Sequence, residues 1–431
     1  MSSAVNRINT ITNHIQSNSL SSSTSSFSHI ELAPPDEIFN TAARYKSDSS
    51  DRKVDLGIGA YRTNEGKPLV LNVVRKAEDI IHANKSLNKE YLPIDGDSVF
   101  VSHARKLLFG SNSSAVNDNR IATIQGLSGT GSLFLGAEFI YRHLPKSTTV
   151  YYSNPTWGNH KAIFQSVGSG IPAKQYRYWN QSERKLDIDG MIQDIESAPN
   201  KSVILLHACA HNPTGVDPTQ EQWKRIASVL KKKQHIPFFD SAYQGFASGD
   251  LESDAWAIRY FVDQGFELLC AQSFAKNFGL YNERCGTLSI VCADKQICSS
   301  VLSQLKLIAR PAYSNPPAHG ARIVGTILSD QQLTSEWHSE LSGMSGRIQT
   351  MRKELLDELT RLQTPGSWQH IITQIGMFSY TGLTPSQCKY LTDKFHIYLL
   401  TNGRISMAGL NTNNVKYVAQ AIDDAVRNVK A

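Results

Sequence analysis

The chain has 431 residues, of which 40% are hydrophobic and 19% charged, and its formal net charge is +6. A chain of this length is too long for one small core and predicts two or three domains. The lysines and arginines are spread along the chain, and no apolar run approaches the roughly 20 residues that cross a bilayer, so the sequence argues against a nucleic-acid-binding or membrane-spanning protein.

The first 30 residues differ in composition from the rest. Residues 1–29 are rich in Ser, Asn and Thr, contain no Asp or Glu, and carry one arginine, Arg7. This composition predicts a disordered tail over residues 1–30. An acid-free, Ser-rich start also fits a mitochondrial or plastid transit peptide, but such peptides usually carry more arginine, so a cytoplasmic location is favoured.

From about residue 120 to 295, short apolar runs alternate with amphipathic segments. Residues 129–142 have apolar side chains at helical spacing, and Thr219-Gln-Glu-Gln222 is a capping box that opens another helix. Continuous apolar strands that alternate with helices predict an α/β fold, with a mostly parallel sheet covered by helices on both faces. The predicted strands are 121–125, 149–152, 203–206, 236–240, 268–271 and 288–291.

The last hundred residues have a different pattern. A polar helical stretch over about 332–363 ends before the turn signal Pro365-Gly366. Three short strands and a closing amphipathic helix follow, which predicts a second, smaller α/β domain. The predicted strands are 376–381, 396–400 and 404–407, and the helix covers 414–429.

Polar and charged residues follow several strands of the larger region. In an open α/β sheet, ligands bind beyond the carboxyl ends of the strands. Leu127-Ser-Gly-Thr-Gly131 follows the first strand and starts a helix, where backbone N–H groups favour an anion. Asp240 ends a later strand, and Lys276 and Arg284 follow the next one. Each has an ordinary explanation on its own: a helix start, a helix cap or a solvated cation.

Gathered at one sheet edge, these residues could bind three functional groups of one ligand. The amine of Lys276 can form an imine with an aldehyde, and the carboxylate of Asp240 can pair with a protonated pyridine nitrogen. The glycine loop can hold a phosphate together with Ser273 and Arg284. An aldehyde, a pyridine and a phosphate are the functional groups of pyridoxal 5'-phosphate, which is therefore the predicted cofactor.

A metal site has little support in the sequence. No cysteines form a CxxC pair, and Cys285, Cys292 and Cys298 lack zinc-ligand spacing. His207-Ala-Cys-Ala-His211 follows a buried strand, and strand alternation would send His207, Cys209 and His211 to one face. A packed or hydrogen-bonded role is favoured for these three side chains, and no metal is predicted.

Motifs spread over most of the chain, in order from about residue 31 to the C-terminus, resemble those of class I aminotransferases in the fold-type I pyridoxal-phosphate family. The resemblance implies a large domain with a mostly parallel mixed sheet plus a smaller α/β domain. We expect residues 31–65 to belong mainly to the small domain, 66–330 to form the large cofactor-binding domain and 331–431 to form the small C-terminal domain. The matching motifs are Leu56-Gly-Ile-Gly-Ala-Tyr-Arg62, Tyr91-Leu-Pro-Ile94, Leu127-Ser-Gly-Thr-Gly131, Asn154-Pro-Thr-Trp-Gly-Asn-His160, His207-Ala-Cys-Ala-His-Asn-Pro-Thr-Gly215, Asp240-Ser-Ala-Tyr-Gln-Gly-Phe-Ala247, Ser273-Phe-Ala-Lys-Asn277, Ser314-Asn-Pro-Pro317 and Gly403-Arg-Ile-Ser406.

The resemblance also implies residue roles at the cofactor. Lys276 is the expected imine-forming lysine and the base that moves the substrate α-proton, and Asp240 keeps the pyridine nitrogen protonated. Tyr243 and Asn212 would bond the ring's phenolic oxygen, and Trp157 would stack on the ring. His160 and His207 would support Asp240. The expected phosphate ligands are Ser128, Gly129, Thr130, Ser273 and Arg284.

Two of the implied site residues would come from another copy of the chain. Tyr91 resembles the residue that reaches the phosphate from the partner subunit, and Arg310 resembles the residue that grips the substrate's side-chain carboxylate from there. Arg404 resembles the clamp for the α-carboxylate, and Gly59 the glycine that lies close to the substrate. The expected assembly is therefore a homodimer with shared sites.

Two arginines select amino acids and keto acids with two carboxylates. The implied activity is reversible ping-pong transamination between L-aspartate and 2-oxoglutarate, giving oxaloacetate and L-glutamate. A broader aminotransferase, or a β-lyase acting on cysteine conjugates, would use the same cofactor chemistry, and Arg310 is the feature that separates them. A binding protein without catalysis is disfavoured because such proteins usually lack the lysine or the phosphate ligands, and this chain has both.

Overall fold

The structure is a computed structural model that describes residues 25–430. The predicted disordered tail lies outside this range, apart from residues 25–30, so it remains a prediction. Within the described range, none of the helices combines the length and the apolar character needed to cross a membrane.

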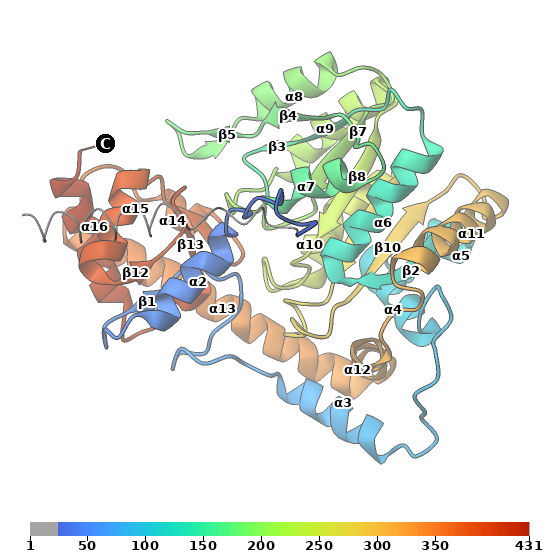
Figure 1. Ribbon diagram of the computed structural model, residues 1–431, viewed down its shortest axis with the longest axis horizontal. Coiled ribbons are helices and arrows are strands. Elements are labelled where there is room, and N and C mark those ends of the chain that lie inside the picture. Colours follow the sequence, from blue (N-terminus) through green and yellow to red (C-terminus); the bar gives the residue numbers. More distant parts are fainter. Residues whose placement is uncertain (1–24, 431) are drawn as a thin grey trace, which may run out of the picture.

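A seven-stranded sheet forms the centre of the molecule, with the order β2-β10-β9-β8-β7-β3-β4 (Figure 1). β10 runs antiparallel to both of its neighbours, and the remaining pairs are parallel. The mostly parallel mixed sheet expected from the sequence is therefore confirmed. Its strands are β2 (Ile121–Leu127), β3 (Val150–Asn154), β4 (Ala173–Arg177), β7 (Val203–His207), β8 (Ile236–Ser241), β9 (Leu268–Ser273) and β10 (Cys285–Val291).

Helices cover both faces of this sheet because successive apolar residues of each strand point to opposite sides. In β7, Val203 and Leu205 join one buried cluster with α6, α7 and α11, whereas Ile204 and Leu206 join another with α8, α9 and α10. The capping box at Thr219 is present and starts α9. These helices are α6 (Ser128–His143), α7 (Asn159–Ser166), α8 (Ile188–Ser197), α9 (Gln220–Lys232), α10 (Leu251–Asp263) and α11 (Lys295–Ala312).

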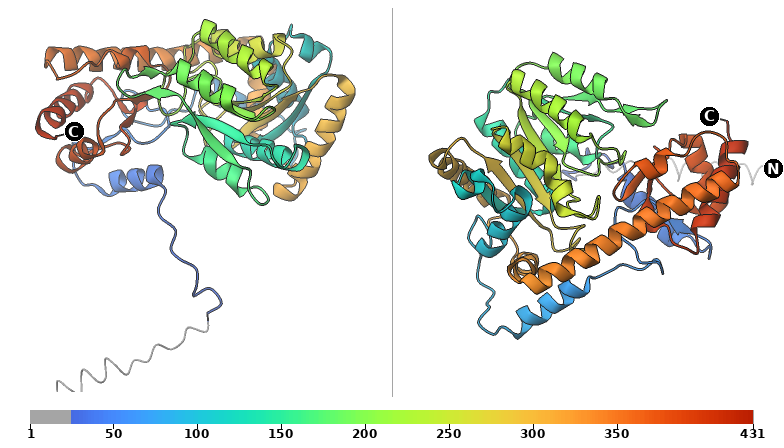
Figure 2. Two further views of the ribbon diagram at one scale, coloured as in Figure 1. Left: turned by 90° about the horizontal axis from the view of Figure 1, so that it is seen from above. Right: turned by 180° about the vertical axis from the view of Figure 1, so that it is seen from behind.

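The long helix α13 (Gln331–Arg361) runs from the sheet region to a smaller C-terminal unit (Figures 1 and 2). Segments from both ends of the chain meet in this unit, since β1 pairs with β12 in parallel and β11 pairs with β13. Its other elements are α2 (Glu37–Ser47), β1 (Val54–Asp55), α14 (His370–Thr373), β11 (Phe378–Tyr380), α15 (Pro385–Phe395), β12 (Ile397–Tyr398), β13 (Arg404–Ser406), η1 (Met407–Gly409) and α16 (Val415–Asn428).

Several short or polar elements could not be assigned from the sequence. β10 begins at Cys285 rather than near 288 because its polar residue Thr287 is fully buried and donates a hydrogen bond to Gln272 of β9. The structure also contains α3 (Asn72–Ala83), α4 (Ser98–Phe109), α5 (Ser114–Asn117), β5 (Trp179–Asn180), β6 (Lys185–Leu186) and α12 (Ala318–Ser329).

Candidate active site

A cavity of about 420 Å³ lies beyond the carboxyl ends of β2, β7, β8 and β9. A larger hollow of about 730 Å³, near the ends of α4 and α10, contains none of the predicted site residues. The smaller cavity is lined by all but two of them: Gly59, Ser128, Gly129, Thr130, Trp157, Asn212, Asp240, Tyr243, Ser273, Lys276, Arg284 and Arg404, together with the supporting His207.

One end of the cavity is built to receive an anion. α6 starts directly after β2, and no side chain caps its first turn, so its backbone N–H groups face the cavity end of the strand. Ser128 has a φ of 60°, and its hydroxyl lies 2.9 Å from that of Ser273. A Cβ on Gly129 would lie 3.3 Å from the Cβ of Ser273, tighter than most such contacts, so glycine suits this approach. Arg284 is exposed beside them and donates to the Tyr281 carbonyl at 2.9 Å.

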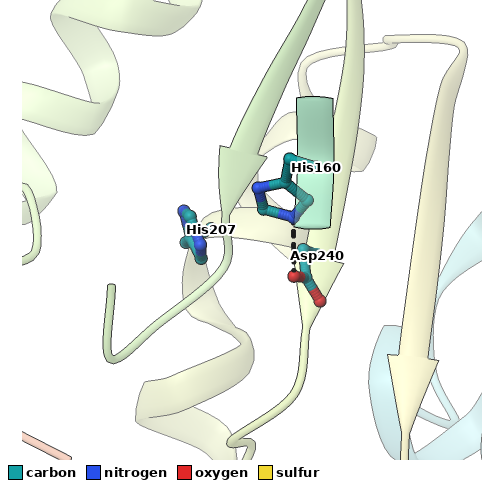
Figure 3. Close-up of side chains that lie close together, drawn as sticks. All are labelled: His160, His207 and Asp240. Carbon is teal, nitrogen blue, oxygen red and sulfur yellow. Dashed lines mark hydrogen bonds and ion pairs between the residues drawn. The ribbon is translucent and has the colours of Figure 1, made fainter. Parts of the chain in front are cut away.

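A buried carboxylate stands at the end of β8. Asp240 Oδ2 lies 3.1 Å from His160 Nε2 (Figure 3). His160 Nδ1 lies 2.8 Å from the Thr156 hydroxyl. Burial raises the pKa of Asp240, but the hydrogen bond from His160 and nearby positive charges outweigh burial and leave the pKa below its usual value. Asp240 is therefore held as a carboxylate that can pair with a cationic ring nitrogen.

The histidines differ from the arrangement expected from the sequence. β7 ends at His207, and Ala210 has a φ of 48°, so strand alternation does not reach His211. His211 is hydrogen-bonded to Ser153 and Thr214 at 2.8 Å each, and Cys209 is buried, which agrees with packed or hydrogen-bonded roles.

The ligand-type atoms that gather most closely are instead those of His160, His207 and Asp240, within 4.8 Å of one another (Figure 3). Burial and the nearby His160 lower the pKa of His207 to about 3, so its ring is neutral at physiological pH. Three buried donors could hold a metal ion, but one of them, Asp240, is already paired with His160. The expectation that the site uses no metal remains a prediction.

A lysine with a depressed pKa lies between the anion end and Asp240. Lys276 Nζ lies 5.2 Å from the ring centroid of Tyr243. Burial lowers the pKa of Lys276 and the positive charge of Arg284 lowers it further, although Asp240 opposes both effects. A larger fraction of the amine is therefore unprotonated at neutral pH than in a solvated lysine, and the neutral amine is the nucleophile.

The opposite wall carries a buried arginine. Arg404 is 3% exposed, donates to the Gly57 carbonyl at 2.7 Å and to Asn212 Oδ1 at 3.4 Å, and leaves its Nε without a partner. Its guanidinium lies 4.0 Å from the ring centroid of Phe378. Burial lowers its pKa to about 10, which still leaves it charged at neutral pH. No ion pair joins Arg404 to a carboxylate within residues 25–430, so it can accept one from a ligand.

Tyr91 and Arg310 lie outside the cavity of this single chain. Tyr91 is 86% exposed, and Arg310 is exposed in the last turn of α11, bonded to Ser314. The two segments are joined, since Asn315 Nδ2 donates to the Leu92 carbonyl at 2.6 Å. Both predicted partner-donated residues therefore belong to one surface region of the chain.

Apolar residues complete the lining of the cavity, and the sequence pattern does not identify them. Ile38 and Phe39 come from α2, Ile58 lies next to Gly59, and Phe378 starts β11. These residue types are common in cores, and nothing in their spacing indicates a ligand. The motif around Gly59 was the only local signal, and it pointed to the glycine alone.

Comparison with known proteins agrees with the resemblance to aminotransferases seen in the sequence motifs. The family model described as aminotransferase class I and II matches residues 51–422. The cytoplasmic aspartate aminotransferase of Gallus gallus is 51% identical over 408 residues, covering 94% of this chain and 99% of that protein.

Two solved structures extend the comparison. The aspartate aminotransferase from Saccharomyces cerevisiae cytoplasm superposes with a TM-score of 0.91 at 47% identity, covering 94% of this chain and 99% of that one. An aromatic-amino-acid aminotransferase from Burkholderia pseudomallei, covalently bound to pyridoxal phosphate, has a TM-score of 0.90 at 40% identity, covering 93% and 100%. The chain therefore belongs to the class I and II aminotransferases.

Proposed function

We propose that this protein catalyses reversible transamination between L-aspartate and 2-oxoglutarate, giving oxaloacetate and L-glutamate. The observation that carries the proposal is the single cavity in which Lys276, Asp240 and the unpaired, buried Arg404 face the same space. The similarity to aspartate aminotransferases at about half identity over nearly the whole chain supports this choice of substrates.

The residues of the cavity fit pyridoxal 5'-phosphate, the cofactor of this family. The uncapped start of α6, with Ser128, Ser273 and Arg284, would hold the phosphate. Asp240 would hold the pyridine nitrogen. When bound, the cofactor supplies an aldehyde that condenses with amines and a ring that accepts the electrons released at the substrate α-carbon.

The chain's own groups have distinct tasks in the proposed reaction. Lys276 Nζ would hold the cofactor at its aldehyde and would move the proton to and from the substrate α-carbon. Asp240, kept ionised by His160, favours the protonated ring nitrogen. Tyr243 and Asn212, in the same cavity, would bond the ring oxygen, and Trp157 would stack on the ring.

Substrate choice follows from two guanidinium groups. Arg404 takes the α-carboxylate of every substrate through the donors that are not used within the chain. Arg310 of a second copy takes the side-chain carboxylate, and Tyr91 of that copy reaches the phosphate. Exposure of both residues on one surface region supports this arrangement. Gly59 would lie beside the substrate, and a Cβ at this position would lie 3.0 Å from the Phe378 ring.

A homodimer follows from the proposal, because each site needs residues of the other copy. The extended segment before α2 leaves the body of the chain and exposes Phe27, Ile30 and Leu32, which supports contact with another copy (Figure 2).

We also propose the division of the chain into two domains. Residues 31–65 and 331–431 would form the small domain and residues 66–330 the large one, which the pairing of β1 with β12 supports. A cytoplasmic location is proposed from the similarity to cytoplasmic relatives; a mitochondrial or plastid location is the alternative.

The half-reactions test the proposed activity directly. Purified protein with bound cofactor is mixed with L-aspartate and no keto acid, and the visible absorption of the cofactor is followed. We expect the band to be lost and then restored by 2-oxoglutarate. A band that aspartate leaves unchanged, but that an aromatic amino acid bleaches, would contradict the substrate assignment and leave the cofactor assignment intact.

Mixed dimers test the shared sites. Lys276→Ala and Arg310→Ala chains are each expected to be poorly active with aspartate as homodimers. A heterodimer of the two has one site in which the intact Lys276 of one copy meets the intact Arg310 of the other. Recovery of activity on mixing supports the shared site, and no recovery in a verified heterodimer contradicts it.

A broader specificity is the second candidate, favoured by the similarity to the aromatic-amino-acid aminotransferase. The apolar residues Ile38, Phe39 and Ile58 in the cavity lining provide a surface on which an apolar side chain could pack. The ratio of kcat/KM for aspartate to that for phenylalanine separates the two candidate functions, because Arg310 favours aspartate only.

A further inference from the structure

Arg352 is a buried cation that lies outside the cavity. It projects from α13, is 3% exposed, and donates to the carbonyls of Ile371 at 2.7 Å, of Gly376 at 2.9 Å and of Phe378. No ion pair joins it to a carboxylate among residues 25–430, and burial lowers its pKa to about 9, which still leaves it charged at neutral pH. A buried guanidinium without a counter-ion is unfavourable for stability, so its contribution must lie in the backbone geometry that it fixes.

The carbonyls that Arg352 binds belong to the segment leading into β11. This segment ends at Phe378, whose ring lies 4.0 Å below the guanidinium carbon of Arg404. The same ring makes an edge contact with Tyr243, at 6.3 Å between centroids, and a Cβ on Gly59 would lie 3.0 Å from it. The Phe378 ring therefore contacts, or lies close to, three of the residues proposed to face the substrate.

A second contact holds the same segment at Gly215. Ile375 N donates to the Gly215 carbonyl at 2.7 Å. A Cβ on Gly215 would lie 2.8 Å from the Phe378 carbonyl oxygen and 3.0 Å from that of Ile375. The backbone is thus held by both Gly215 and Arg352, and removal of the guanidinium would leave three carbonyls without these bonds.

We infer that Arg352 is a positioning residue for the substrate clamp: through the backbone of Phe378, it orients the Arg404 guanidinium toward the substrate α-carboxylate. The inference rests on the function proposed above. It adds to that function a residue that touches neither substrate nor cofactor and that no motif marks.

The test is Arg352→Gln, assayed with two amines that differ only in the group that Arg404 binds. L-Aspartate carries an α-carboxylate, and 3-aminopropanoate is the same molecule without it. We expect kcat/KM in the half-reaction to fall at least about tenfold with aspartate, mainly through KM, and less than about twofold with 3-aminopropanoate. Equal losses with the two amines, or no loss with aspartate, would overturn the inference.

Two further measurements separate positioning from general damage. In Arg352→Gln the Kd of succinate is expected to rise about tenfold, whereas the affinity for the cofactor changes by less than about twofold, because the groups proposed to hold the phosphate and the ring nitrogen are not touched. Arg427→Gln is the matched control, since Arg427 also donates to two carbonyls, those of Leu362 and Gln363, but far from Phe378. A clearly weaker cofactor affinity in Arg352→Gln, or a weaker succinate affinity in the control, would also contradict the inference.

A second route covers the case in which Arg352→Gln does not fold. Arg352→Lys keeps the charge but cannot reach three carbonyls in a planar fork, and Phe378→Leu keeps the backbone but removes the ring under Arg404. Both are expected to show the same selective loss with aspartate, and equal losses with both amines count against the inference. If the wild-type protein itself does not react with aspartate, the proposed function fails first, so the two failures are distinguishable.

Discussion

The cofactor end and the substrate end of the cavity are built differently. At the cofactor end the reacting groups lie within one chain: Lys276, Asp240 and the start of α6 all sit at strand ends of one sheet, and of the predicted cofactor-binding residues only Tyr91 lies outside the cavity. The substrate end has Arg404 in place, whereas Arg310 lies exposed on the outer surface. In the proposed function, the reacting groups therefore belong to one subunit, whereas the preference for dicarboxylates needs Arg310 of a second copy.

The largest expected effect lies at the cofactor end. Lys276→Ala removes both the amine that holds the cofactor and the base that moves the α-proton, so kcat should fall by at least about 10⁴-fold. Steady-state rates with aspartate and 2-oxoglutarate measure it. Lys295→Ala, at an exposed lysine that starts α11, is the control and should keep full activity.

Asp240 gives the next largest effect. Asp240→Asn keeps the size of the side chain but removes the negative charge, which should lower kcat by about 10²- to 10³-fold. The KM for aspartate should change little, because the substrate end is untouched. A variant with normal kcat and raised KM would show that the two ends are not separable as described.

Substitutions of the two arginines are expected to differ in their effect on kcat/KM for aspartate and for phenylalanine. Arg404→Ala should lower kcat/KM by about 10²-fold for aspartate and for phenylalanine alike, since both carry an α-carboxylate. Arg310→Ala should lower it by a similar factor for aspartate only. Parallel losses for both amino acids in Arg310→Ala would remove the basis for the dicarboxylate preference.

The smallest expected effect concerns stability and pH. Burial lowers the pKa of His207 to about 3, whereas an unfolded histidine has a value of about 6.5. Between these values the unfolded chain binds a proton that the folded chain does not, so the free energy of unfolding falls as the pH falls, by at most about 1.4 kcal/mol per pH unit.

His207→Gln should flatten this part of the profile. Urea unfolding of the wild type and the variant at pH 5, 6 and 7 provides the measurement. Two profiles of equal slope would mean that His207 does not titrate in this range, and that its ring contributes packing only.

Much of this arrangement could be predicted from the sequence. Strands with continuous apolar runs, such as 203–206, were assigned correctly because burial on both faces leaves a strong pattern. The edge on which Asp240 and Lys276 meet followed from the rule for parallel sheets. The start of β10 before its polar residue Thr287 could not be predicted. The Thr287 hydroxyl can be buried because it donates a hydrogen bond to Gln272 of another strand, and the local sequence does not show this contact.

The apolar and supporting residues of the site were out of reach for a related reason. Phe378 and Ile38 are ordinary core residue types, and only the tertiary structure brings them to the cavity. The proposed role of Arg352 depends on three carbonyls that lie 19 to 26 residues further along the chain. No local pattern in a sequence reports which carbonyl a buried arginine will meet.

The helix α13 has a thermodynamic consequence for the whole chain. Its 31 residues span roughly 46 Å, and its first turns bind the sheet region through Trp337 Nε1, which donates to the Asn277 carbonyl at 2.8 Å. Its later turns hold the C-terminal unit through Arg352. Because one continuous helix belongs to both cores, neither can melt without losing part of the other's packing, and heating should produce a single calorimetric transition.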